Sequence, residues 1–153
     1  MIEQAAGVAV TIPGVLADYQ LTIPGRLPGL NEYTAANRAS SSQGAKMKRQ
    51  NQELVMWYIA QQLRAPSGGQ LKITRPVFML FTFYEPNRKR DRDNVSSFAR
   101  KVIQDALVRY GTLKDDGWGQ VTGYMDRFFV DKNNPRIVVQ FIEQTGDSSH
   151  GST

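Results

Sequence analysis

The residues of this sequence with the clearest chemical potential are aspartates in two short groups. Asp91 and Asp93 stand two positions apart, and Asp115 and Asp116 follow farther along the chain. In an extended segment, side chains at i and i+2 point to the same side, so the first pair can share one site. Mg²⁺ binds oxygen ligands, often one or two carboxylates together with water and a substrate phosphate. The pattern predicts a Mg²⁺ site at Asp91 and Asp93, completed by Asp116, that activates water against a phosphodiester.

Basic residues surround the first aspartate pair and recur in a segment upstream of it. We expect seven of them to contact a nucleic-acid backbone: Arg88, Lys89, Arg90, Arg92, Lys46, Lys48 and Arg49. The chain has a net charge of +5, and residues 37–110 carry all of the excess positive charge. This distribution indicates a polyanionic partner. An exposed basic face that keeps the protein soluble explains it equally well.

The residue types that the sequence lacks exclude several kinds of site. There is no cysteine, which excludes disulfides, thiolate nucleophiles, and zinc or iron–sulfur centres with cysteine ligands. The one histidine is His150, so a triad or metal site that depends on histidine is not expected. No apolar stretch approaches the length that spans a bilayer, and residues 1–17 lack the basic start of a signal peptide. We therefore expect a cytoplasmic protein with no membrane partner.

The hydrophobic pattern predicts the elements that must position these side chains. Residues 18–23 alternate as a strand does, and the apolar run 76–84 predicts a central strand covered on both faces. Residues 121–130 and 136–143 are predicted to pair as a hairpin, joined by a turn at 131–135. Helices are expected over residues 45–63 and 94–109.

The predicted fold is a single α+β domain with the order β-α-β-α-β-β, two main helices and a mixed or antiparallel sheet. We expect residues 1–17 to be an N-terminal extension, residues 18–145 the folded domain and residues 146–153 a flexible tail. The second helix should end at Gly111 and bury six apolar residues, namely Val95, Phe98, Val102, Ile103, Ala106 and Leu107.

Taken together, several of these motifs resemble the RusA family. The similarity is carried by the runs Arg90-Asp91-Arg92-Asp93-Asn94, Asp105-Ala106-Leu107 and Asp115-Asp116, by Lys101 and Gly111, and by an opening strand and Pro-rich loop that end at Asn31. RusA-like proteins are Holliday junction resolvases, often carried by phages. The resemblance implies a homodimeric, Mg²⁺-dependent endodeoxyribonuclease of DNA recombination and repair, with Mn²⁺ as a possible substitute. It would bind four-way junctions or other branched DNA and nick symmetric strands.

The resemblance also implies roles for single residues. The metal-binding acids of the family fall on Asp91, Asp93 and Asp116. Its catalytic lysine falls on Ser97 when counted forward from Asp93, and on Lys101 when counted back from Asp105-Ala106-Leu107, as if one helical turn had been inserted. We assign this role to Lys101, because a serine cannot replace an ammonium that stabilises developing negative charge.

Simpler structural roles explain the same residues. Asp93 or Asn94 can cap the following helix, and Asp115-Asp116-Gly117 can be an ordinary turn. A helix of about 24 Å would also keep Asp116 far from Asp93 unless the helix is short or broken, the Asp-x-Asp segment lies back along it, or Asp116 serves a partner subunit. Trp118 and Tyr124 can stack on unpaired bases, but at least one of them is expected in the core.

Three functions agree with this pattern. The first is metal-dependent hydrolysis of branched DNA, with water as the nucleophile. The second is a DNA-binding protein of the same fold whose nuclease activity is weak or lost, with Ser97 in the place of the lysine. The third is a small phosphohydrolase acting on nucleotides, which needs a closed pocket. The spread of basic residues from Lys46 to Arg109 suits an extended polyanion better.

Overall fold

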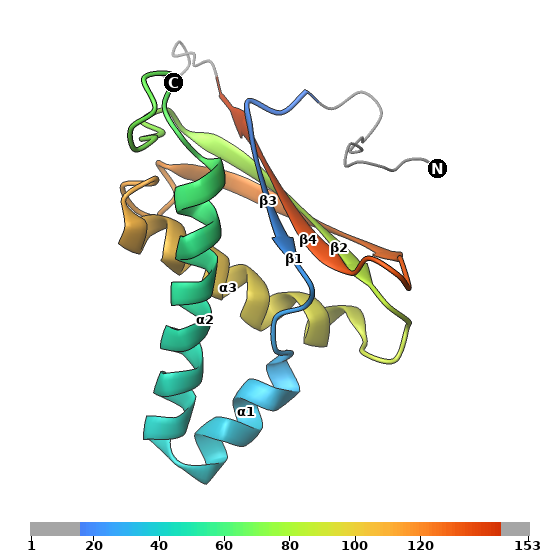
Figure 1. Cartoon of the computed structure of the whole chain (residues 1–153). Helices are drawn as coiled ribbons and strands as arrows, with labels where there is room; N and C mark the ends of the chain where they lie inside the picture. Colours follow the sequence, from blue (N-terminus) through green and yellow to red (C-terminus); the bar gives the residue numbers. More distant parts are fainter. Residues whose placement is uncertain (1–15, 145–153) are drawn as a thin grey trace.

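The computed structural model describes residues 16–144, so the residues beyond them at either end of the chain, including the expected tail, lie outside the described part. Its elements are β1 (Tyr19–Pro24), α1 (Leu30–Ala39), α2 (Ser41–Gln62), β2 (Val77–Glu85), α3 (Arg92–Tyr110), β3 (Val121–Val130) and β4 (Arg136–Glu143) (Figure 1). This order confirms a single α+β domain. It contains one helix, α1, that the hydrophobic pattern did not predict.

The four strands form one mixed sheet in the order β1-β4-β2-β3. The central position predicted for β2 is confirmed, because the strand lies between β4 and β3, but the predicted cover on both faces is wrong, because within residues 16–144 the helices lie on one face of the sheet alone. Strands β2 and β3 are parallel and are connected through α3, whereas β4 runs antiparallel to both β1 and β2. The predicted hairpin of β3 and β4 is wrong, because β2 lies between them. The short turn after β3 carries the chain past the end of β2 and into the gap beside β1.

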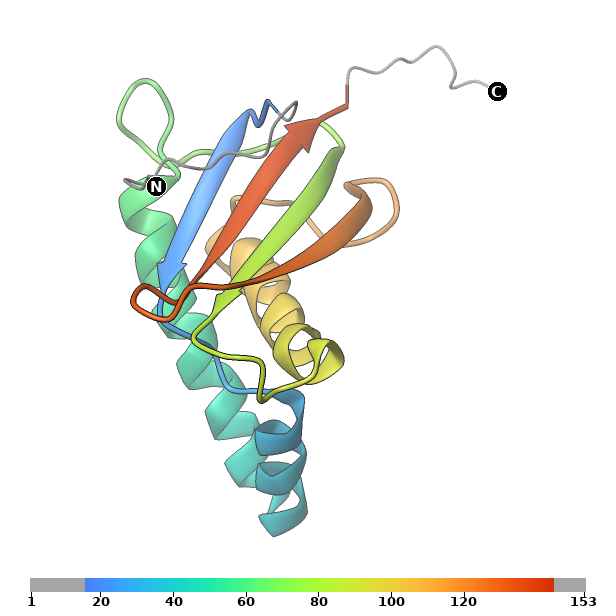
Figure 2. The ribbon, with the colours of Figure 1, turned by 90° about the vertical axis from the view of Figure 1, so that its right-hand side faces the viewer.

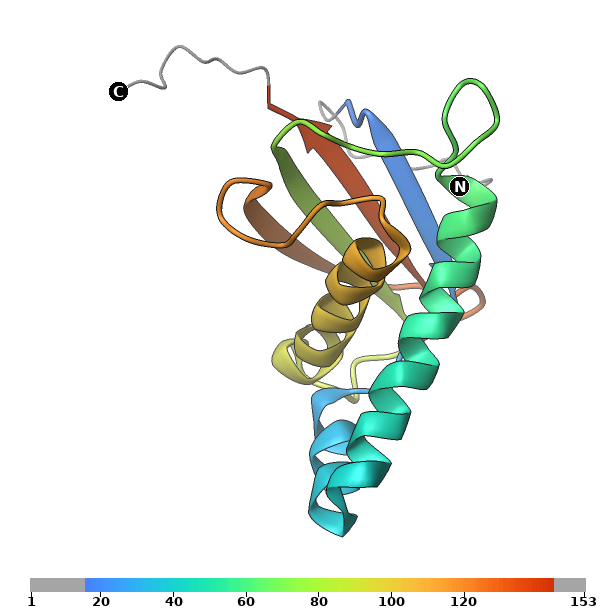
Figure 3. The same ribbon diagram turned by 90° about the vertical axis from the view of Figure 1, so that its left-hand side faces the viewer.

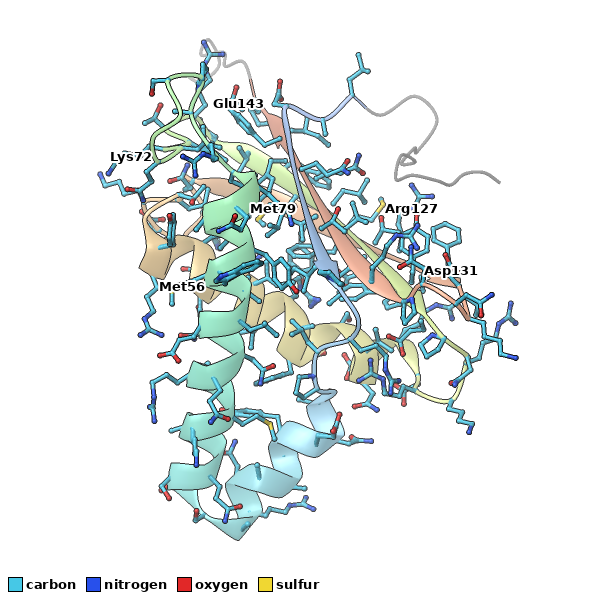
Figure 4. The ribbon with its side chains drawn as sticks, viewed as in Figure 1. Met56, Lys72, Met79, Arg127, Asp131 and Glu143 are labelled. Carbon is cyan, nitrogen blue, oxygen red and sulfur yellow. The ribbon has the colours of Figure 1, made fainter. Side chains whose placement is uncertain are left out.

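The helices cover one face of the sheet, and the other face carries no helix within residues 16–144 (Figures 2 and 3). Side chains of alternate strand residues fill the space under α2 and α3, with Leu21, Met79, Phe81, Val139 and Phe141 fully buried there. On the opposite face, Figure 4 shows Arg127 pointing away from the helices, while Met79 lies on the helix side. No helix in the described range is both long and apolar enough to cross a bilayer.

Helix α3 follows the sequence closely. All six apolar residues that were expected to face the core are buried, together with Ser96 and Ala99. The helix ends at Gly111, whose φ of 98° lies in the left-handed region that glycine adopts without strain. Its backbone N–H donates to the carbonyls of Leu107 and Val108. The helix runs without a break, which excludes a short or interrupted helix as a way to bring Asp116 back to Asp93.

Helix α1 was not predicted because Leu30 and Tyr33 are its only large apolar residues, which are too few for a clear helical pattern, and none of its residues is buried. It packs side by side with the start of α2, and together the two helices project beyond the sheet (Figure 1). Ser40 separates them and caps α2, because its hydroxyl accepts a hydrogen bond from the N–H of Gln43 at 3.1 Å. The basic residues Lys46, Lys48 and Arg49 lie on this projecting part of α2.

Candidate active site

A pocket of about 410 Å³ opens where the carboxyl ends of the parallel strands β2 and β3 meet the first turn of α3. This edge is where open α/β sheets generally bind ligands, and the free N–H groups of a helix N-terminus favour anions there. Three arginines, one asparagine, two acids and four apolar residues line the pocket: Arg88, Arg90, Arg92, Asn87, Glu85, Asp91, Val95, Phe128, Phe129 and Val130.

Asp91 stands at the wall of this pocket as the N-cap of α3. Its Oδ1 accepts a hydrogen bond from the N–H of Asn94 at 2.8 Å, which satisfies one of the free donors of the first helical turn. The expectation of an extended Asp-x-Asp segment is wrong, because the helix already begins at Arg92. The alternative that Asp93 or Asn94 caps this helix is also wrong, because the cap is Asp91.

Asp93 lies in the first turn of α3 and points along the helix, not toward Asp91. Its Oδ1 accepts a hydrogen bond from the hydroxyl of Ser97, four residues later, at 2.7 Å. Residues two positions apart on a helix do not face each other, which explains why the carboxylates of Asp91 and Asp93 point in different directions. Ser97, the residue at the direct count for the family lysine, therefore contacts one of the two aspartates of the Asp-x-Asp motif.

A buried acid at the end of β2, Glu85, holds one of the three arginines of the pocket, Arg90. Glu85 accepts two hydrogen bonds from Arg90, at 3.1 Å from Nε and 2.9 Å from Nη2, and a third from Arg26 at 3.4 Å. The side chains of Glu85 and Arg90 are only 10% and 15% exposed. This paired geometry is the strong form of an arginine–carboxylate contact. Arg90 is therefore part of the scaffold of the pocket, whereas Arg88 and Arg92 stay exposed.

The Pro-rich loop after β1 packs against the start of α3, so two motifs that are far apart in the sequence meet at the pocket. Arg90 donates to the carbonyl of Leu27 at 3.2 Å, and the N–H of Asn31 donates to Oδ1 of Asn94 at 2.8 Å. Gly29 makes this approach possible, because a Cβ atom there would lie 2.6 Å from Oδ1 of Asn94 and 3.0 Å from Arg90.

Lys101 and Asp116 form a second polar cluster, farther along α3. The Lys101 amine lies 3.2 Å from Asp116 and 3.1 Å from Asp105, and Lys48 of α2 approaches Asp105 at 3.8 Å. The hydrogen bond to Asp105 is the main reason that the pKa of Lys101 lies above its ordinary value; Asp116 adds to this, and partial burial opposes it. The eight residues from Asp93 to Lys101 correspond to about 12 Å along the helix axis.

The predicted catalytic residues thus form two separate groups within the chain. Asp91 and Asp93 lie at the start of α3 with the arginine pocket, while Lys101 pairs with Asp105 and Asp116, and Lys48 approaches Asp105. Residues 16–144 contain no group of three or more acids or histidines placed to hold a metal ion. The first group offers at most the two carboxylates of one pair, Asp91 and Asp93. That number is compatible with Mg²⁺, because this ion is often bound by one or two carboxylates together with water and a substrate phosphate.

No protein-family model matches this sequence, and no curated protein matches it either. The resemblance to RusA-like proteins therefore rests on the sequence motifs alone.

Sequence reasoning missed Glu85 as the residue that holds Arg90. Its only signal was an acid at the end of an apolar strand, followed at once by basic residues. Trp118 and Tyr124 were expected to place at least one ring in the core, but both are exposed, at 97% and 52%. The guanidinium of Arg100 lies over the Tyr124 ring, 4.3 Å from its centre.

Proposed function

We propose that this protein is a RusA-like, Mg²⁺-dependent endodeoxyribonuclease that nicks Holliday junctions and other branched DNA. The observation that carries the proposal is the place of Asp91. It is an exposed carboxylate at the N-terminus of α3, in a pocket that three arginines line. Arginines and helix N–H groups bind phosphate, and a carboxylate beside them is placed to hold a cation against that phosphate.

Each group of the pocket has a distinct task in this proposal. The exposed Arg88 and Arg92 bind the DNA backbone, whereas Arg90, held by Glu85, keeps the loop before α1 against the pocket. Asp91, with one carboxylate oxygen engaged by the helix cap, offers the other to the cation. Asp93 lies in the first turn of α3 and fixes the side chain of Ser97 through a hydrogen bond. The chemistry that bound Mg²⁺ supplies at such a site is activation of water and neutralisation of charge on the phosphodiester.

Asp116 and Lys101 enter the proposal differently from the two aspartates at the start of α3. Within one subunit they lie about two helical turns from Asp93. We propose that they act at the site of the partner subunit in the homodimer, or that Asp91 and Asp93 serve without them. The basic residues of α2, of which Lys48 lies next to this second cluster, extend the surface available to DNA beyond the pocket.

The decisive experiment is nicking of a synthetic four-way junction in Mg²⁺ by Asp91→Asn. Asparagine caps a helix as well as aspartate does, so this variant should melt like the wild type while it loses the carboxylate. We expect nicking to be lost and junction binding to be kept or strengthened, because less negative charge faces the phosphates. The matched control is Asp115→Asn. Asp115 is exposed, and its side chain accepts a hydrogen bond from the N–H of Gly117 in a turn, so this variant should still nick the junction.

Wild-type nicking rates in Asp91→Asn would contradict the assignment of the site. Asp93→Asn is the companion variant and is expected to lose nicking as well. Hydrolysis of free nucleotides by the wild type, without affinity for the junction, would favour a small phosphohydrolase. A pocket of about 410 Å³ is large enough for such a substrate.

One observation favours a second candidate, a branched-DNA-binding protein without nuclease activity. The Lys101 amine is engaged by both Asp105 and Asp116, and Ser97 stands where the family lysine falls at the direct count. A protein in this state would lack a free ammonium beside the scissile phosphate. Junction binding by the wild type with no cleavage in Mg²⁺ or Mn²⁺ would support this candidate over the first.

A further inference from the structure

The two edge strands of the sheet, β1 and β3, differ in how well their outward backbone groups are protected from pairing with another strand. At the β1 edge, the side-chain amide of Gln62 accepts a hydrogen bond from the N–H of Thr22 and donates one to its carbonyl, both at 2.7 Å. One side chain of α2 thereby occupies backbone groups of β1 that another strand would need. Strand β1 is also short and ends at Pro24. Such devices are known to protect sheet edges from pairing with other chains.

Strand β3, at the other edge, carries no comparable protection. It is ten residues long, it pairs with β2 alone, and no side chain of the described residues hydrogen-bonds to its backbone. The N–H of Asp131 donates to the carbonyl of Glu85 in β2 at 2.7 Å. Because backbone N–H groups alternate along a strand, those of Phe129 and Arg127 also face β2, and those of the residues between face the open edge.

The side chains of β3 are unusually apolar for an exposed strand. Eight large hydrophobic side chains are exposed in the described part of the chain, and four of them belong to β3: Tyr124, Met125, Phe129 and Val130. The one acid of the strand, Asp126, is turned to the helix side and pairs with Arg100 at 2.8 Å. An exposed edge of this length and composition is a template for a further strand.

We propose that β3 pairs antiparallel with β3 of a second copy of this chain, about a two-fold axis at Arg127. In this register, residues at equal distances from Arg127 face each other. Met125 of one copy then lies opposite Phe129 of the other, and Tyr124 opposite Val130, so all four exposed apolar side chains find apolar partners. The two four-stranded sheets become one continuous sheet of eight strands, and a two-fold contact of this kind closes on itself.

Charge and salt give the interface a recognisable signature. The only like-charge pair in this register is Arg127 with its own symmetry mate, although each guanidinium also lies over the Phe129 ring of its own strand, 5.1 Å from the centre. Added salt screens this repulsion and should strengthen the dimer. Salt weakens contacts to DNA phosphates, so the effects of salt on dimerisation and on DNA binding have opposite signs.

The pairing depends on β3 alone and stands whether or not the protein is a nuclease. It also supplies the surface for the homodimer proposed above.

The absence of cysteine makes the register directly testable in the full chain. Arg127 and its mate would form a non-hydrogen-bonded antiparallel pair, with Cα atoms about 4.5 Å apart, which suits a disulfide. Arg127→Cys is therefore expected to give a reducible covalent dimer under mild oxidation. Gln20→Cys, exposed on the same face of the sheet but on β1, is the control and should not cross-link.

Sedimentation measurements test the apolar pairs. We expect the wild type to dimerise, and Met125→Lys to raise the dissociation constant at least about tenfold, because the new ammonium would face Phe129 of the other copy. Leu54→Lys, an equivalent change at an exposed residue of α2, should have no effect. A monomeric wild type, a dimer that Met125→Lys does not weaken, or no cross-link in Arg127→Cys would each overturn the proposal. Loss of nicking in Asp91→Asn, with the dimer intact, would separate this result from the proposed activity.

Discussion

The contact between Arg90 and Glu85 predicts a stability difference between two arginines of the same pocket. Arg90→Ala would leave Glu85 buried, with only Arg26 beside it. Breaking one side of a buried ion pair costs about 3–5 kcal/mol. Arg26 lies 3.4 Å from Glu85 and is itself 42% exposed, so it can offset part of that loss. We expect the free energy of unfolding to fall by about 3 kcal/mol, the lower end of the range.

This loss should lower the melting temperature by roughly 6–12 °C in a chain of this size. The assay is urea unfolding of the wild type, Arg90→Ala and the control Arg88→Ala. Arg88 is exposed, so its loss should change stability by no more than about 0.5 kcal/mol. The double variant Glu85→Gln/Arg90→Ala should be more stable than Arg90→Ala, because no stranded charge remains. Equal stability of Arg90→Ala and Arg88→Ala would refute the role given to Glu85.

Three further predictions follow from the site. Gly29→Ala should cost about 1–3 kcal/mol of unfolding free energy, because its Cβ would overlap Oδ1 of Asn94, and urea midpoints measure this. The raised pKa of Lys101 means that its ion pairs stabilise the fold below its unfolded pKa of 10.5 and lose this effect as pH rises through the higher folded pKa. The stability difference between the wild type and Lys101→Met should therefore shrink above pH 10.5. Arg88→Ala should reduce the slope of log affinity for junction DNA against log salt by about 0.9, as loss of one phosphate contact requires, and a titration series in salt tests it.

The extent to which the sequence predicts this fold differs between local and long-range structure. Strands β3 and β4 have the bounds that the sequence predicts, because the turn residues at Asp131–Pro135 separate the two strand patterns. Their pairing was predicted wrongly, because a short connection favours a hairpin but does not exclude a neighbour inserted between the strands. The order of the strands is decided by the parallel pairing of β2 with β3, which α3 connects. The sequence of the β3–β4 segment contains no information about that pairing.

The candidate site divides in the same way. The sequence identified the segment around Asp91 and its arginines, because residue types and spacing are local properties. It did not reveal that Asp91 would cap α3, since Asp91, Asp93 and Asn94 are all good capping residues and only the backbone decides among them. The position of Asp116 depends on how long α3 continues, and the unbroken helix leaves it beside Lys101. The Gln62 bonds to Thr22 depend on the packing of α2 against β1, which no spacing in the sequence encodes.

The position of β4 has a consequence for how the protein must form. It is the last strand of the described chain, yet it lies between β1 and β2, with Tyr19 opposite Phe141. While the chain is being synthesised, β1 has no partner until residues 136–143 have emerged from the ribosome. Contacts across such long separations slow folding. A polypeptide that stops before β4 would retain the β2-α3-β3 unit but leave β1 without a strand partner and the edge of β2 that pairs with β4 exposed, a state prone to aggregation and recognition by chaperones.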